Sequence, residues 1–231
     1  VAGGSMYSQY RCVKASACFV MNEGTTSAES ASCFVNPLTA LGMVETMRME
    51  DHTALVHTAA ASNLGQMLVK ICLNENIQLV NIVRKEEHVT LLKDLGAKNI
   101  LDRKEFQSES KLLEKAIWDG VVDNVGGDSL TKILAQTKPS GIVAACGMAG
   151  GTKLNTSVMP FIIRGVKLWG IDSSASSIKR REFAWNEAKN LVNFDKLKNL
   201  TKEHSLEDLV KIYPKMLKGE IFGRVVVNPN K

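Results

Sequence analysis

ALVHTAAASNLGQMLVKICLNENIQLVNIVR, residues 54–84, decides the fold of this chain. Two apolar runs enclose a loop of small residues and an amphipathic stretch, so the segment predicts strand, tight loop, helix and strand within about thirty residues. That is the size of a βαβ unit whose first loop can hold the pyrophosphate of a dinucleotide. The segment ends in Arg84-Lys85, where many NAD-binding proteins carry an acid, and a base there can pair with the 2′-phosphate of NADP.

Apolar strands continue to alternate with helices after this segment. The predicted strands are residues 54–57, 78–83, 99–101, 120–123, 141–145, 167–170 and 224–227. The predicted helices are residues 64–75, 86–95, 110–116, 128–134, 179–192 and 206–217, with 38–47 ahead of them. This order predicts an α/β fold, a Rossmann-type doubly wound parallel sheet covered on both faces. We expect the last strand, 224–227, to return to the edge of this sheet, and we expect two short strands in residues 1–25.

Composition narrows the class of protein. The chain has 231 residues, is 45% hydrophobic and carries a net charge of +5, with bases and acids interspersed. The longest basic run, residues 179–181, is followed at once by Glu182, so we expect an ordinary solvated surface and no nucleic-acid partner. No apolar run is long enough to span a membrane and no signal pattern opens the sequence, so we expect a cytoplasmic protein without a membrane partner.

The cysteines and histidines predict no metal site. The five cysteines form no CxxC pair, and the four histidines lack the spacing of metal ligands. Cys72 and Cys146 sit in apolar runs and are interpreted as buried thiols, which favours a reducing compartment.

The loop after the first strand, residues 58–65, could bring backbone N–H groups and a helix N-terminus against a diphosphate. Ser62 or Asn63 would cap the helix, and Gly65 would allow close packing of helix and strand. The loop lacks the glycines of GxGxxG, so the alternative is a capped helix of any α/β protein.

Bases follow the next two strands. Arg84 and Lys85 end the second strand and Arg103 ends the third, so all three could share one phosphate pocket at the carboxyl edge of the sheet. The alternatives are plain exposed bases, and for Arg103 a pair with Asp102 or Glu105.

Glycine-rich loops follow the fourth and fifth strands, DNVGGD at 123–128 and CGMAGG at 146–151. Glycine there allows backbone to approach a ribose or a flat ring. Asp123 has no base or nucleophile paired with it by spacing and is interpreted as structural. No catalytic residue is predicted, because a bound nicotinamide supplies hydride chemistry and the protein supplies orientation.

Several motifs together resemble the medium-chain dehydrogenase/reductase superfamily, in its zinc-free quinone-oxidoreductase-like branch. They include GGSMYSQY at 3–10, NPLTA at 36–40 and VDNVGG at 122–127. The second half is similar to the acrylyl-CoA reductase subgroup, through LDRKEF at 101–106, VAACGMAGG at 143–151, VMPFIIR at 158–164, GIDS at 170–173 and Gly223-Arg224.

The resemblance implies an NADPH-dependent reductase that passes a hydride to a small-molecule substrate, a quinone or an activated C=C such as a 2-enoyl or acrylyl thioester. The alternative is a truncated, non-catalytic NADP-binding or interaction module. The resemblance also implies a homodimer, for which the strand at residues 167–170 is a candidate. The residues that would line the cofactor site are Ser62, Asn63, Leu64, Gly65, Gln66, Arg84, Lys85, Arg103, Val125, Gly126, Met148, Ala149, Ile162, Ser173 and Arg224.

The resemblance further implies three parts. Residues 1–26 would be the remnant of a GroES-like substrate domain, and residues 27–205 the Rossmann NADP-binding domain. Residues 206–231 would be a helix and strand that return to the substrate-domain side.

Overall fold

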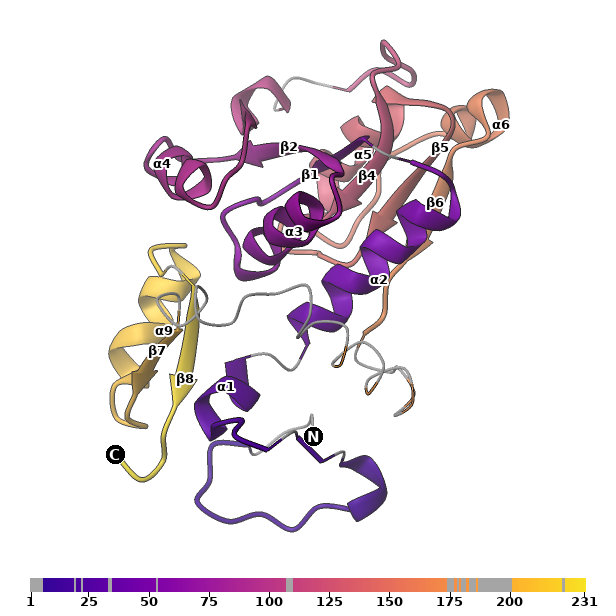
Figure 1. Cartoon of the computed structure of the whole chain (residues 1–231). Coiled ribbons are helices and arrows are strands. Elements are labelled where there is room, and N and C mark those ends of the chain that lie inside the picture. Colours follow the sequence, from indigo (N-terminus) through magenta and orange to yellow (C-terminus); the bar gives the residue numbers. More distant parts are fainter. Residues whose placement is uncertain are drawn as a thin grey trace. The chain divides into compact units, whose positions relative to one another are not determined.

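The computed structural model describes residues 6–18, 20, 21, 23–32, 35–52, 54–106, 110–173, 177, 179, 182, 186, 201–221 and 223–231. The chain divides into two compact units (Figure 1). Unit 1 joins Val1–Leu38 to Ser174–Lys231, and unit 2 is Thr39–Ser173. The predicted boundaries after residues 26 and 205 stay predictions.

Unit 2 is built on a six-stranded sheet with the order β3-β2-β1-β4-β5-β6, in which every neighbouring pair is parallel. This order confirms the predicted doubly wound fold. The strands are β1 Ala54–His57, β2 Gln78–Val83, β3 Asn99–Asp102, β4 Trp118–Asp123, β5 Thr137–Ala145 and β6 Lys167–Gly170.

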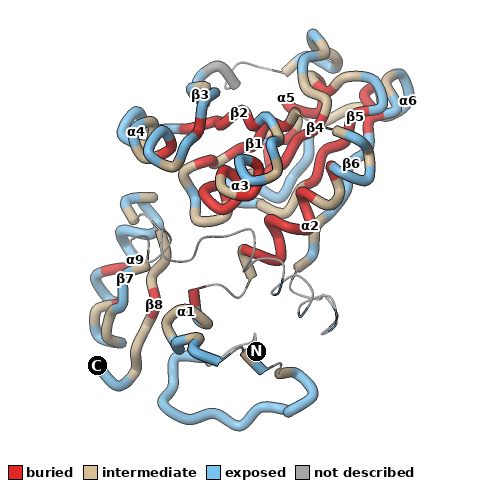
Figure 2. The backbone as a smooth tube through the Cα atoms, in the orientation of Figure 1, coloured by how far each residue is buried: buried red, intermediate tan, exposed pale blue. Residues whose placement is uncertain are grey.

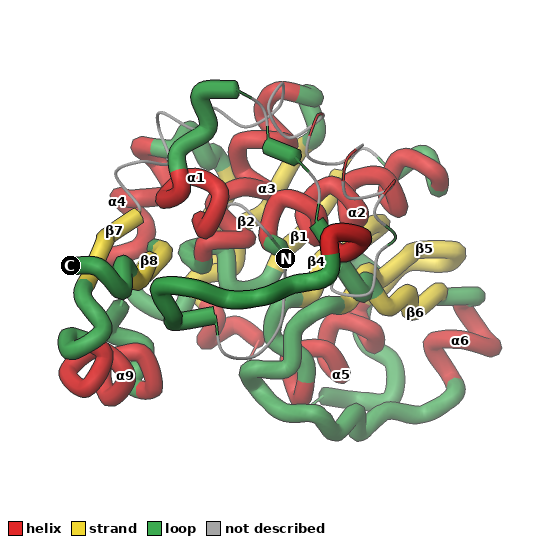
Figure 3. Tube along the Cα trace, turned by 90° about the horizontal axis from the view of Figure 1, so that it is seen from below, coloured by secondary structure: helices red, strands yellow, loops and turns green. Residues whose placement is uncertain are grey.

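The connecting helices cover both faces of this sheet. They are α2 Asn36–Met49, which begins in unit 1, α3 Asn63–Asn74, α4 Glu87–Asp94, the 3-10 turn η2 Arg103–Phe106, α5 Gly127–Gln136 and α6 Met159–Arg164. Figure 3 shows α2 and α3 on one side of the central strands, and α5 and α6 on the other. The central strands are therefore buried on both faces, which is why their sequences read as continuous apolar runs (Figure 2).

One core cluster lies between the sheet and α5. Val56, Val121 and Val143 from three neighbouring strands pack against Ile133 and Leu134 of this helix. On the opposite face a side chain at Gly120 would collide with α2, since its Cβ would lie 2.8 Å from Met47 Sδ. The edge strand β6 is different, because all four of its residues are exposed.

Unit 1 contains the 3-10 turn η1 Ala15–Ala17, α1 Ser27–Ser32, β7 Thr201–His204, α9 Leu209–Leu217 and β8 Arg224–Val227. A capping box begins α1, in which Thr26 Oγ1 accepts from Glu29 N and Glu29 Oε2 accepts from Thr26 N. The two strands pair in parallel, with Thr201 opposite Arg224.

Four expectations need correction. The last strand forms, but it pairs with β7 and does not return to the large sheet. Residues 6–18, 20 and 21 contain η1 and no strand, since no described strand lies beside them to pair their backbone groups. Residues 110–116 form no helix, because Glu114 N donates to Ala135 O at the end of α5. Leu206–Glu207 lies ahead of α9, which begins at Leu209. The predicted helix 179–192 lies largely outside the described residues.

Candidate functional site

The loops that follow β1 and β4 flank the point where the strand order of the sheet reverses. The chain turns from β1 toward β2 on one side, and β4 leads to β5 on the other. In open α/β sheets a crevice forms at this point outside the carboxyl ends of the strands, and ligands bind there. The candidate site is therefore built from residues 58–62 and 123–127, both in unit 2.

The first loop turns tightly into α3. Ser62 caps the helix, because its Oγ accepts from Gly65 N at 3.1 Å. A side chain at Gly65 could not be accommodated, since its Cβ would lie 2.4 Å from Ala60 O. The predicted cap is confirmed, whereas the close packing at Gly65 is against the loop residues Ala59 and Ala60 and not against a strand. The loop leaves the sheet through Ala59, whose φ of 52° lies in the left-handed region.

Asp123 ends β4, and its carboxylate is fully buried. Oδ1 accepts from the Thr58 hydroxyl at 3.0 Å, and Oδ2 accepts from Gly126 N at 2.7 Å. Burial raises the pKa of Asp123, while the hydrogen bonds from Gly126 N, Thr58 and Val125 N oppose that shift. The side chain is thus committed to holding loops together, which fits the structural role expected for it.

Glycines let the loops after β4 and β5 pack against each other. A Cβ at Gly147 would lie 1.9 Å from Asn124 O, and one at Gly127 would lie 2.7 Å from Gly150 O. Gly150 N also donates to Val125 O at 2.8 Å. Gly127 and Gly147 therefore cannot carry a side chain, because backbone approaches backbone at both positions.

A basic hollow of about 510 Å³ lies beside the carboxyl ends of β2 and β3. Its basic lining residues are Arg84, Lys85, Lys93, Lys98 and Lys104. Arg84 is exposed, whereas Lys85 Nζ pairs with Glu87 Oε1 at 3.3 Å. Arg103 does not line the hollow, but its Nε is buried and has no hydrogen-bond partner among the described residues.

The remaining candidates lie on several helices and loops of unit 2. Gln66 is buried, and its Nε2 donates to Ala61 O at 2.8 Å, within the first loop. Met148 is 66% exposed at the tip of the β5 loop, and Ile162 is 75% exposed on α6. Ser173 Oγ lies 2.6 Å from Thr39 Oγ1. Asn63, Leu64 and Val125 are half-buried and Ala149 is exposed.

Arg224 belongs to unit 1, where its Nη2 donates to Ala31 O at 3.3 Å. Every other candidate lies in unit 2, and the structure gives Arg224 a partner within its own unit.

Two residues at the centre of the site had no role assigned from the sequence, Thr58 and Asn124. Asn124 N donates to Thr58 Oγ1 at 2.7 Å, and Asn124 Nδ2 donates to Thr58 O at 3.1 Å. Both are polar residues, and each comes directly after the end of an apolar strand, β1 for Thr58 and β4 for Asn124. That signal could have found them, since the carboxyl ends of parallel strands meet at one edge.

His57, Cys72 and Cys146 offer no nucleophile or acid at neutral pH. His57 is buried, which lowers its pKa to about 4, although its Nε2 lies 2.6 Å from Asn81 Oδ1. Burial raises the pKa of Cys72 to about 12 and that of Cys146 to about 11, so both remain thiols. The four described cysteines are free, and the described residues contain no group of three or more His, Cys, Asp or Glu side chains placed for a metal ion.

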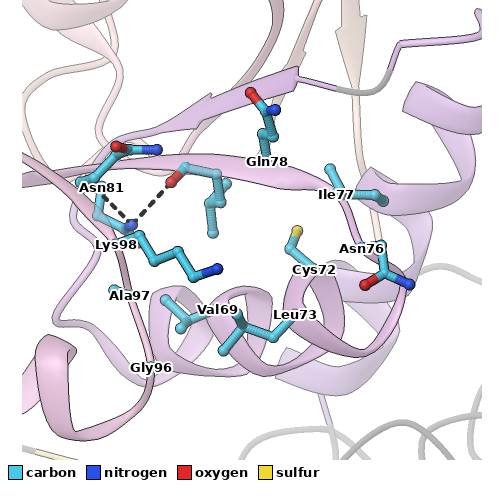
Figure 4. A pocket seen from close by; sticks show the side chains of 12 residues that line it. Val69, Cys72, Leu73, Asn76, Ile77, Gln78, Asn81, Gly96, Ala97 and Lys98 are labelled. Atoms are coloured by element: carbon cyan, nitrogen blue, oxygen red, sulfur yellow. Dashed lines mark hydrogen bonds between the residues drawn. The ribbon is translucent and has the colours of Figure 1, made fainter.

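A smaller hollow of about 190 Å³ lies at the opposite, amino edge of the sheet (Figure 4). Its wall comes from the second half of α3 and the first residues of β2 and β3, including Cys72, Leu73, Ile77 and Lys98. Its polar floor is Asn81, whose Nδ2 donates to Leu79 O and Asn99 O.

Among the described helices, none is both long enough and apolar enough to cross a membrane.

The sheet order, the capped α3 and the glycine loops define a dinucleotide-binding type of doubly wound domain. Residues 64–190 match the family described as zinc-binding dehydrogenase. The chain belongs to this family, within the medium-chain dehydrogenase/reductase superfamily, in its quinone-oxidoreductase-like branch with an acrylyl-CoA reductase-like second half.

Curated relatives and solved structures support this family assignment. The chain is 34% identical over 231 residues to the acrylyl-CoA reductase AcuI of Ruegeria pomeroyi, covering 97% of this chain and 69% of that protein. It is 33% identical to the putative quinone oxidoreductase YhfP of Bacillus subtilis, covering 74% and 52%. The crystal structure of Escherichia coli YhdH with bound NADPH is 33% identical, with a TM-score of 0.85 over 93% of this chain and 68% of that one. The chain thus spans between about half and two thirds of these proteins.

Proposed function

We propose that this chain is the cofactor-binding part of an NADPH-dependent oxidoreductase that does not use zinc. The observation that carries the proposal is the set of loops at the carboxyl edge of a Rossmann sheet, in a chain similar over 93% of its length to a protein solved with NADPH. A quinone, or an activated C=C such as a 2-enoyl or acrylyl thioester, is the proposed hydride acceptor, from the names of the relatives.

The described residues fit this cofactor. The capped N-terminus of α3, at Ser62–Gly65, would hold the pyrophosphate with backbone N–H groups. Arg84 and Lys85 would bind the 2′-phosphate together with Arg103, whose buried Nε without a hydrogen-bond partner suits an anion. Bound NADPH would supply the hydride.

The other lining residues would contact the ribose and nicotinamide. In this proposal Val125 and Gly126 approach the ring from the β4 loop, and Met148 and Ala149 do so from the β5 loop. Gln66, Ile162 and Ser173 complete the proposed lining.

Arg84→Ala tests the cofactor and its form at once. Because the change removes a charge-assisted contact to the 2′-phosphate, NADPH should bind about 1.5–3 kcal/mol more weakly, while NADH is almost unaffected. Calorimetric titration with both nucleotides measures this. Arg48→Ala is the matched control, since Arg48 pairs with Glu75 outside the basic hollow. Equal weakening of NADPH and NADH by Arg84→Ala would exclude the 2′-phosphate role.

A non-catalytic NADP-binding module is the second candidate. It is favoured by the chemistry of the site, because the titratable side chains at the ends of β1 and β4, neutral His57 and Asp123, are both engaged in hydrogen bonds. Loss of NADPH absorbance with a panel of quinones and enoyl thioesters would support the enzyme. Tight binding without absorbance loss would support the module.

We propose in addition that β6 pairs two copies of the chain into a homodimer. β6 is an edge strand with every residue exposed, and Trp169 is 56% exposed on it. An unpaired edge of this kind is a template for pairing with another chain. Light scattering should show a dimer that Trp169→Glu dissociates, whereas a wild-type monomer would refute the pairing.

The free cysteines support a cytoplasmic location.

A further inference from the structure

Every polar group of Thr58 is bonded to the end of β4. Its N–H donates to Val122 O at 3.1 Å, and its carbonyl accepts from Asn124 Nδ2 at 3.1 Å. Its hydroxyl donates to Asp123 Oδ1 at 3.0 Å and accepts from Asn124 N at 2.7 Å. The residue is only 3% exposed, so water does not compete for these bonds. Thr58 is therefore fixed in one backbone and one side-chain geometry.

Ala59, the next residue, has an unfavourable backbone conformation as a result. Ala59 has a φ of 52°, a conformation that an alanine avoids unless its surroundings impose it. Beyond it, Ala60 N donates to Ile82 O of β2 at 3.1 Å, and Ser62 N donates to Ala59 O at 2.9 Å. The loop is thus held by β4 at Thr58 and by β2 at Ala60, and it delivers Ser62 to the start of α3.

We infer that Thr58 is a positioning residue for the pyrophosphate of the cofactor, whose hydroxyl bridges Asp123 and Asn124 and thereby sets the shape of loop 58–62. The inference rests on the proposed function. No group of Thr58 needs to touch the ligand, because its effect passes through the backbone that it holds. The hydroxyl matters because it donates and accepts at once, and valine, with the same shape, does neither.

The same hydroxyl ties the β1 loop to the loops after β4 and β5. Asp123 Oδ2 accepts from Gly126 N, and Asn124 Oδ1 accepts from Cys146 Sγ at 3.3 Å. Three loops that arise far apart in the sequence thus share one buried hydrogen-bond network. Removing the Thr58 hydroxyl leaves one carboxylate oxygen and one backbone N–H without their bonds, and both lie where the loops meet.

The test compares Thr58→Val, Thr58→Ser and Thr137→Val in titrations with NADPH and with adenosine 2′-monophosphate. Thr58→Val should weaken NADPH roughly tenfold or more. It should leave adenosine 2′-monophosphate, which lacks the pyrophosphate, within about twofold, since distant sites act independently. Thr58→Ser restores the hydroxyl and should restore NADPH affinity. Thr137→Val removes another buried hydroxyl, bonded to Ile133 O at the amino edge, and should lower stability without changing either affinity.

Equal NADPH affinity of Thr58→Val and wild type overturns the inference and leaves the proposed function standing. Equal loss with both ligands also overturns it, because it indicates general unfolding of the site. A wild-type chain that binds neither ligand overturns the proposed function itself. If circular dichroism shows that Thr58→Val does not fold, Thr58→Ala takes its place, since it removes the same hydroxyl without placing a second methyl group against Asp123 Oδ1 and Asn124 N. Unchanged NADPH affinity in that variant then overturns the inference.

Discussion

The two ends of α3 reach opposite edges of the same sheet, and a residue with left-handed backbone lies within four residues of each end. At the C-terminal end Asn76 has a φ of 56°, Asn76 N donates to Leu73 O and Ile77 N donates to Cys72 O. This is the common way in which a helix stops, and asparagine tolerates it. At the N-terminal end the left-handed residue is Ala59, which does not tolerate it.

The difference shows where this domain departs from local preference. The C-terminal end of α3 follows from its own sequence and borders the small hollow of Figure 4. The N-terminal loop follows from tertiary contacts, because Thr58 and Ala60 are bonded to β4 and β2. Backbone strain persists only where the surroundings over-determine it, and such places cluster at functional sites.

The largest effect is expected at the two ends of β4, which carry Asp123 at the loop edge and Asp119 at the other. Asp123→Ala should lower the free energy of unfolding by about 4 kcal/mol, because buried donors of Thr58 and Gly126 lose their acceptor. Asp119→Ala should cost less than about 1 kcal/mol, since its bond to Lys138 is exposed to solvent. Urea denaturation measures both. Similar losses in the two variants would mean that the loop edge is not specially held.

A somewhat smaller loss of folding stability is expected at acidic pH, through protonation of His57. The folded-state pKa of His57, about 4, lies below the usual value of 6.5, so between these values the unfolded chain binds the extra proton. Stability is therefore lost as the pH falls from about 6.5 to 4, by about 3 kcal/mol for this group. The measurement is the free energy of unfolding across that range in the wild type and in His57→Leu.

The His57→Leu variant is the control, because it has no imidazole to protonate. It should lose stability less steeply over the same range, even if it is less stable at neutral pH through the unpaired Asn81. Parallel curves for the two proteins would show that His57 is not buried in its neutral form.

Most strands of the large sheet could be predicted because the local sequence indicates where each strand begins and ends. The bounds of β1 and β2 were predicted to the residue, since their mainly apolar residues give way to Thr58 and Arg84, and those of β6 were predicted to the residue although that strand is exposed. The capping role of Ser62 follows from the same local rules. The strand β7, with the polar sequence Thr-Lys-Glu-His, gives no such pattern, and its pairing with β8 depends on a partner far along the chain.

The hydrogen bonds at the centre of the site could not be predicted in the same way. Thr58 and Asn124 are 66 residues apart, and only the register of β1 against β4 brings them together. The left-handed Ala59 is hidden for the same reason, since an alanine gives no signal of a turn that tertiary contacts impose. Sequence therefore indicated which edge of the sheet carries the site, and the hydrogen bonds show what shapes it.

The smallest effect returns to the two ends of α3. Ala59→Gly should raise the free energy of unfolding by about 1 kcal/mol, because glycine has no Cβ to strain in the left-handed region and this gain exceeds its larger entropy when unfolded. Asn76→Gly, the matched change at the other end, should gain no more than about 0.3 kcal/mol, since asparagine already tolerates that conformation. Urea denaturation of the two variants decides the point. Equal gains would remove the distinction between the ends, because they would show that Ala59 is no more strained than Asn76. Affinity for NADPH should change less than about twofold in Ala59→Gly, since Thr58 and Ala60 hold the loop through bonds that the new glycine leaves in place.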